Sequence, residues 1–191
     1  MMLSLFALTS DPAKRIVKFN LSNDVQADLT TYLKDQEVWF DRQQDEIVFD
    51  GKYKPDAGEV LCIENYDDID NLESAIRNPT SLDLVDPSED FFHDIKALFS
   101  GYILATGGFK VLLQNFDRRK IISTNGLSFF HSDNVYKKIE GIGLTIDHKL
   151  TATIEEGKLK FFSFHNARQI FDLSEYYKEA TNKNVIEFSN M

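Results

Sequence analysis

The chain has 191 residues, with 21 Lys and Arg against 31 Asp and Glu, so its formal net charge is −10. Its 42% hydrophobic and 27% charged residues exclude wholesale disorder, and a chain of this length can bury a hydrophobic core. The acidic total argues against DNA binding over the whole surface, because such binding depends on neutralising phosphates.

The first half of the chain predicts a mixture of strands and helices. Alternating or apolar runs bounded by turn residues indicate strands at 3–8, 15–21, 46–49 and 60–63. A helix is expected after Ser22, and a second over 69–77, where Pro79 disfavours its continuation. Pro87 is expected to open a third helix that runs on through Ile95 and Leu98.

The second half predicts strands at 102–105, 109–116, 120–123, 150–154 and 158–164. The last two are joined by a glycine-containing turn at 155–157, which indicates a hairpin. A short helix is expected at 166–171, another after Ser174, and the start of a further one at Val185. The predicted fold class is α+β, with a mixed N-terminal region (1–90) and a mainly antiparallel second part (91–191).

No catalytic or metal-binding group emerges from the motifs. The four histidines, at 93, 131, 148 and 165, lack the close spacing of zinc ligands, and Cys62 lies in an apolar strand. The glycine pairs continue into no phosphate-binding pattern. The sequence therefore predicts a protein that is not an enzyme and uses no metal or cofactor. The single cysteine also suits a reducing cytoplasm.

Charge is divided unevenly along the chain. Residues 1–95 carry a net charge of −13 and residues 96–191 carry +3. Three adjacent cations follow Asp117 at a predicted turn, where they can present donors to phosphate oxygens. A solvated turn that protects strand edges is the alternative. The candidate DNA-binding residues are Lys110, Arg118, Arg119, Lys120, Lys137 and Lys138.

Aromatic residues accompany these cations. Phe129 and Phe130 are candidates for stacking on bases, as are Phe161, Phe162 and Phe164. The alternation around Phe162 and Phe164 suits the buried face of a strand better.

Two stretches resemble a known family. One runs from Gly101 to Ser123, and the other, from Leu150 to Thr181, contains the pattern Phe-x-x-Ala-Arg-x-Ile-Phe-Asp-Leu-x-x-Tyr-Tyr from Phe164. Together, over 91–182, they resemble the KwaB family of the Kiwa anti-phage defence system. Members of that family are usually longer, so the chain is expected to be truncated at its C-terminal end.

The resemblance implies a cytoplasmic bacterial protein that binds DNA and works with a membrane partner similar to KwaA. It leaves open whether the protein forms a homodimer. It implies association with the inner membrane through that partner and brings no established catalytic residues. A protein–protein adaptor, whose acidic first half docks a basic partner without contacting nucleic acid, is the alternative.

Overall fold

The computed structural model describes residues 2–42, 45–50, 56, 58–67, 69–122 and 126–176. Its body is an eight-stranded sheet with the order β2-β1-β5-β6-β11-β12-β4-β3, in which β3 and β4 are parallel and the other neighbours antiparallel. The predicted α+β class is therefore confirmed. Strands from both predicted regions, 1–90 and 91–191, form this one sheet.

The elements of the first half lie close to their predicted positions. They are β1 (Phe6–Thr9), β2 (Ile16–Lys18), α1 (Asn23–Asp41), β3 (Asp45–Val48), β4 (Glu59–Ile63) and α2 (Asp70–Arg77). A short 3-10 turn, Pro12–Lys14, joins β1 to β2. The predicted strands and the first two helices are thus confirmed, and β1 and β2 are shorter than expected.

The helix predicted after Pro87 is wrong beyond its first turn. Helix α3 spans only Glu89–His93, and the chain then enters β5 (Ile95–Ile103). Ile95 and Leu98 follow the earlier apolar residues at helical spacing, which gave the wrong prediction. β5 lies between β1 and β6 and is buried on both faces, so its apolar residues run together and the alternation typical of a half-buried strand is lost.

The remaining elements confirm most of the second-half predictions. They are β6 (Phe109–Asn115), β7 (Ile121–Ile122), β11 (Ala152–Glu155), β12 (Lys158–Phe161), α4 (Phe164–Ile170) and the 3-10 turns η2 (Arg118–Lys120) and η3 (Ser174–Tyr176). The predicted hairpin turn is confirmed, since Glu156 and Gly157 both have positive φ, at 51° and 76°. The helix expected at Val185 lies outside the described residues.

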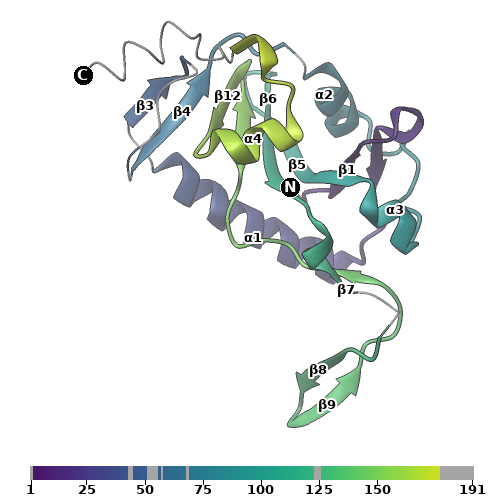
Figure 1. The fold of residues 1–191 in the computed structure, drawn as a ribbon. Helices are drawn as coiled ribbons and strands as arrows, with labels where there is room; N and C mark the ends of the chain where they lie inside the picture. The colour runs from purple at the N-terminus through teal and green to yellow at the C-terminus, as the bar shows by residue number, and fades with distance from the viewer. Residues whose placement is uncertain are drawn as a thin grey trace, which may run out of the picture.

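Two hydrophobic cores cover the two faces of the sheet. On one face, α1 and α3 pack through Leu33, Phe40 and Phe92 against Leu98 and Leu112 of the central strands. On the other, α2 and α4 cover the sheet through residues that include Leu72 and Ala167. Figure 1 shows α1 along one side of the sheet and α2 on the other. The side chains of each central strand therefore alternate between the two cores.

No helix in the described part of the chain is long and apolar enough to cross a membrane.

Candidate functional site

A hairpin that the sequence analysis did not predict projects from the body. Strands β8 (Phe129–Ser132) and β9 (Val135–Lys138) pair with each other and with no strand of the main sheet. Figure 1 shows this hairpin extending away from the sheet and helices. From residue 128 to the turn it spans about 17 Å at the usual rise of a strand. We call residues 126–142 the arm.

The turn of the arm contains the sequence signal from which the hairpin could have been predicted. Asp133 and Asn134 both have positive φ, at 54° and 61°, which defines a two-residue hairpin turn of the type that suits the strand twist. Asp and Asn are among the residues that tolerate this conformation. An Asp-Asn pair between Phe129-Phe130 and Val135-Tyr136, which favour strands, is therefore a recognisable hairpin signal.

Pairing within the arm places its side chains on two faces. Phe129 lies opposite Lys138 and His131 opposite Tyr136, so these four share one face, which we call the aromatic face. The His131 and Tyr136 rings are in contact, with centroids 5.2 Å apart. Phe129 and Tyr136 are 57% and 73% exposed. Phe130, Ser132, Val135 and Lys137 form the opposite face.

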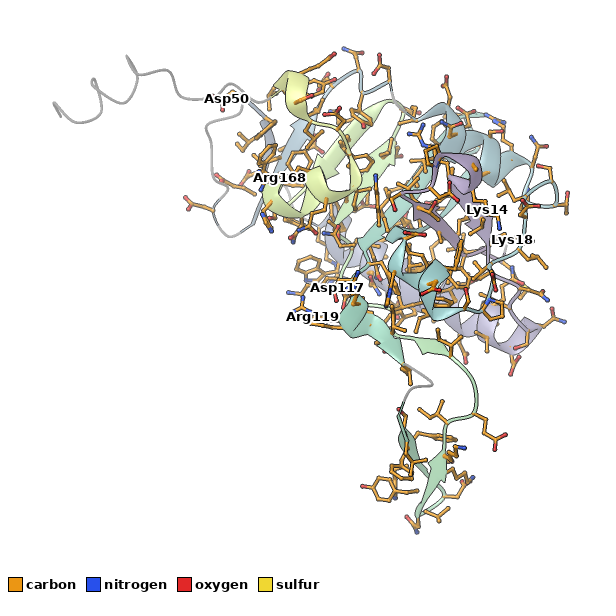
Figure 2. The ribbon with its side chains drawn as sticks, turned by 45° about the vertical axis from the view of Figure 1, so that its right-hand side comes forward. Lys14, Lys18, Asp50, Asp117, Arg119 and Arg168 are labelled. Carbon is orange, nitrogen blue, oxygen red and sulfur yellow. The ribbon has the colours of Figure 1, made fainter. Side chains whose placement is uncertain are left out.

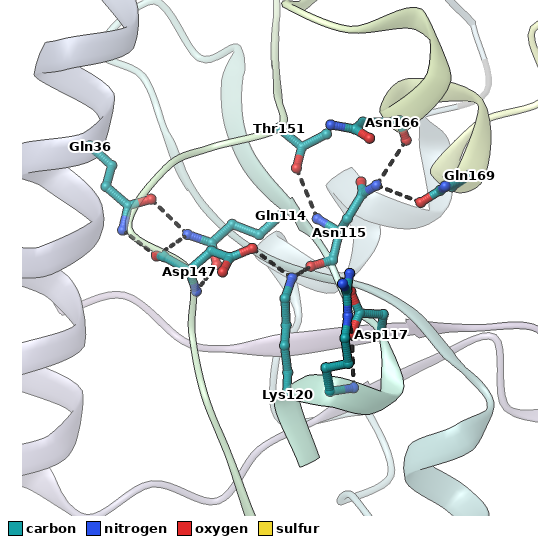
Figure 3. Close-up of polar contacts among 10 residues, drawn as sticks. Gln36, Gln114, Asn115, Asp117, Lys120, Asp147, Thr151, Asn166 and Gln169 are labelled. Carbon is teal, nitrogen blue, oxygen red and sulfur yellow. Dashed lines mark hydrogen bonds and ion pairs between the residues drawn. The ribbon is translucent and has the colours of Figure 1, made fainter.

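A buried polar network fixes the place where the arm leaves the body. Gln114 of β6 donates to the side-chain oxygen of Gln36 on α1 at 2.6 Å and to the Asp147 carbonyl at 2.8 Å. It also accepts from the Asp147 backbone N–H at 3.0 Å, and Gln36 donates to the same carbonyl at 2.9 Å. Figure 3 shows these bonds tying the returning segment to β6 and α1.

Lys120 belongs to this network. Its ammonium lies 2.7 Å from a carboxylate oxygen of Asp147 and donates to the Asn115 carbonyl, and only 13% of its side chain is exposed. Beyond it, β7 pairs with β10 (Gly143–Leu144), which closes the base of the arm. Lys120 is therefore engaged inside the structure, in holding the arm to the body (Figure 3).

Lys110 is engaged as well, in a different part of the molecule. It lies in β6 with 7% of its side chain exposed, and its ammonium is 2.7 Å from Asp41, 3.0 Å from Glu155 and 3.2 Å from Glu37. Tyr102 donates to Glu37 at 2.5 Å. A cavity of about 250 Å³ adjoins this cluster, but the ammonium that faces it is already paired with carboxylates.

The ion cluster around Lys110 shifts the pKa values of Lys110 and Glu37. Burial alone would lower the pKa of Lys110, but the carboxylates of Asp41 and Glu155 outweigh it, and the pKa is raised. Burial would raise the pKa of Glu37, but hydrogen bonds from Lys34 and Tyr102 and the charge of Lys110 lower it. Both groups are therefore held in their charged forms, which suits a structural ion cluster.

The other predicted residues remain at the surface. Arg118 and Arg119 are exposed in η2, and Arg119 is paired with Asp117 at 2.9 Å. Figure 2 shows Arg119 beside Asp117 where the arm begins, well apart from Lys14 and Lys18. Lys137 and Lys138 are exposed on opposite faces of the arm, and Lys137 is paired with Asp133 at 2.8 Å. Four of the six candidate DNA-binding residues are thus exposed, whereas Lys110 and Lys120 each belong to an internal polar network.

An apolar groove lies beside the base of the arm. It has a volume of about 410 Å³ and is lined by Val25, Asp28 and Tyr32 of α1 and by Leu144 and Ile146 of the returning segment, among others. Val25 and Tyr32 are 47% and 42% exposed. An open groove of this composition can receive apolar or aromatic side chains.

Among the described residues, no group of three or more His, Cys, Asp or Glu side chains is arranged to hold a metal ion.

The fold and the arm together define an α+β protein with an exposed aromatic hairpin as its candidate contact element. The chain matches no protein-family model, no curated protein and no solved structure. The resemblance to the KwaB family therefore stays a prediction.

Proposed function

We propose that this protein is an interaction adaptor that contacts a protein partner through its arm. The observation that carries the proposal is the exposure of large apolar side chains on an element that projects from the body. Their exposed fractions range from 46% to 73%, for Leu127, Phe129, Phe130, Val135 and Tyr136. Large apolar patches of this kind mark interaction sites, and aromatic residues supply much of the energy of protein interfaces.

The charge of the arm supports a protein partner over DNA. Its two lysines are balanced by Asp133 and Glu140, so the arm is electrically neutral, and the chain as a whole carries −10. A DNA-binding arm gains affinity from each phosphate that it neutralises, and a neutral arm gains little. The apolar side chains are therefore the larger source of binding free energy.

DNA contact is the second candidate, and the exposure of Arg118 and Arg119 favours it. The Arg119 side chain is 90% exposed, and both guanidinium groups lie at the base of the arm. The DNA role of a KwaB-like defence component, with its membrane partner, would depend on these two residues and Lys138. A titration of duplex DNA distinguishes this candidate from the adaptor.

The adaptor proposal is tested by affinity capture with the full chain. Tagged wild type and a Phe129→Ser, Tyr136→Ser variant are cross-linked in cells, and co-purifying proteins are quantified. We expect the partners enriched by the wild type to fall at least about tenfold with the variant, since truncation of such an aromatic anchor costs about 1–2 kcal/mol or more. Both sites are exposed, so the variant should fold normally.

Leu84→Ser provides the matched control, because Leu84 is 57% exposed but lies on the body. It should leave capture unchanged. Equal capture by wild type and the arm variant, with binding to duplex DNA that depends on Arg118 and Arg119, would overturn the adaptor proposal in favour of the second candidate.

A further inference from the structure

We infer that the partner of the arm is a second copy of this chain, and that two copies exchange arms, each placing its aromatic face in the apolar groove of the other. This inference rests on the adaptor function proposed above. The exchange would cover two apolar surfaces that are exposed in the single chain, the projecting aromatic face of the arm and the concave groove.

The groove has the size and chemistry to receive aromatic side chains. Its volume of about 410 Å³ is lined almost entirely by aliphatic and aromatic groups, and Asp28 is its charged residue. Val25, Leu29 and Tyr32 follow one another at three- or four-residue spacing, so they form a continuous stripe along α1. A partner that fits this stripe must present apolar surface with a cation near Asp28.

The aromatic face of the arm meets both requirements. It presents Phe129, His131 and Tyr136 in a row, with Lys138 opposite Phe129 at the base end of the hairpin. Asp24 and Asp28 lie on the same side of α1, one turn apart, and both are exposed. Lys138 is the cation of this face. The aromatic face therefore complements the groove both in charge and in apolar surface.

The geometry of the base makes the exchange reciprocal. Leu144 lines the groove and also belongs to β10, which pairs with β7 at the base of the arm. The arm projects away from its own body, as Figure 1 shows, so it leaves its own groove open. A two-fold axis beside the base would bring each arm to the groove of the other copy, which is the arrangement of an isologous dimer.

The area that a stable dimer needs sets how much of the arm and the groove each contact must cover. Specific interfaces bury at least about 1,200 Å² in total, so each of the two equivalent contacts must supply about 600 Å². Phe129 and Tyr136 are 57% and 73% exposed, so at about 150–250 Å² for a fully buried aromatic side chain they supply roughly 200–330 Å² of each contact. The rest must come from His131, Lys138 and the residues that line the groove.

The test measures the mass of the purified full chain by sedimentation velocity across a dilution series. We expect a concentration-dependent dimer in the wild type and a shift to monomer in Phe129→Ser, Tyr136→Ser. Leu84→Ser is the matched control, because Leu84 is 57% exposed and lies on the body, outside both the arm and the groove. It should leave the dimer largely unchanged, and equal effects of the two variants would overturn the inference.

A charge swap tests the pairing of the two surfaces directly. Lys138→Glu should weaken the dimer about tenfold, because it brings a carboxylate to Asp28 and Asp24. Asp28→Lys added to Lys138→Glu should restore most of the affinity, whereas Asp28→Lys added to Lys137→Glu should not. Rescue in the first pair alone would support the assigned contact, and absence of rescue would overturn it.

Other occupants of the groove give different results. A protein that stays monomeric at every concentration, but captures another protein through its arm, would overturn the second copy as partner and leave the adaptor function intact. A monomer that loses no partner on arm mutation, and takes an apolar dye into the groove, would overturn both.

Discussion

Lys110 is the most heavily engaged charged side chain described in this structure, and its role is to hold α1 to the sheet. Its ammonium meets two carboxylates of α1, Glu37 and Asp41, and a third from β11, Glu155. Glu37 and Asp41 are four residues apart, so both face the sheet from the same side of the helix. Removing this cation leaves three neighbouring carboxylates to repel one another, although Lys34 stays paired with Glu37 at 2.8 Å.

We expect Lys110→Met to lower the free energy of unfolding by about 2 kcal/mol, because it removes the cation that three carboxylates share, while Glu37 keeps Lys34 and Tyr102 as partners. Urea denaturation followed by circular dichroism measures the change. Lys137→Met is the control, since Lys137 and its partner Asp133 are 45% and 81% exposed. It should cost less than about 1 kcal/mol. Equal effects of the two substitutions would contradict the role assigned to Lys110.

The lowered pKa of Glu37 predicts how stability changes in acid. Folding favours the ionised carboxyl, so its contribution is present above the ordinary pKa of 4.5 and is lost as the pH falls through the lower value of the folded state. Glu37→Gln should therefore reduce stability at neutral pH and flatten the decline below pH 4.5. Urea midpoints from neutral to acidic pH measure both effects, and an unchanged acid slope in the variant would contradict them.

The positions of Lys110 and Lys120 also show what the sequence could not predict. Both were expected at a basic surface because they lie near Arg118 and Arg119 in the chain. Their partners, however, come from distant segments: Glu37 and Asp41 for Lys110, and Asp147 for Lys120. Spacing along one strand does not reveal which carboxylates of a packed helix will face it, so these two engagements depend on the tertiary fold.

At the scale of elements, local signals were sufficient where distinctive spacing or turn residues mark a segment. The amphipathic helix α1 and the hairpin of β11 and β12 were predicted because their spacing and turn residues are distinctive. The first part of β5, as far as Leu98, was predicted as helix because Ile95 and Leu98 follow Phe91 and Phe92 at helical spacing. The arm was missed because its short strands bury little surface, and only the Asp-Asn turn marks it.

The polar network at the base of the arm predicts that substitution of a buried residue, Gln114, weakens the attachment of the arm to the body. Gln114→Met should destabilise the protein by about 1–3 kcal/mol, since it leaves the side-chain oxygen of Gln36 and the backbone N–H of Asp147 without their buried partner. Hydrogen exchange should quicken at the Asp147 amide, which donates to Gln114. Gln169→Met, at an exposed position on α4, is the control and should change stability by less than about 0.5 kcal/mol. Unchanged exchange at Asp147 in the Gln114 variant would contradict the anchoring role.

At the scale of the whole molecule, the distribution of charge matters more than the number of basic residues. The second part of the chain carries a net positive charge in sequence, yet its strands β5, β6, β11 and β12 lie in one sheet with those of the acidic first part. Internal ion pairs then remove Lys110 and Lys120 from any exposed basic surface. The predicted DNA-binding patch is thereby reduced to Arg118, Arg119, Lys137 and Lys138.

These four cations set an upper limit on the salt dependence of DNA binding. If all four contacted phosphates, the logarithm of the binding constant would fall with the logarithm of salt with a slope of about −3.6, and the total charge of −10 opposes even this. We therefore expect fluorescence anisotropy to show no saturable binding of duplex DNA at physiological salt and weak binding at low salt. Arg118→Glu with Arg119→Glu should abolish the low-salt signal, whereas Lys14→Glu, on another part of the body, should preserve it (Figure 2). Tight binding at physiological salt with a slope steeper than about −4 would require phosphate contacts that the exposed cations at the arm cannot supply, and would contradict the adaptor.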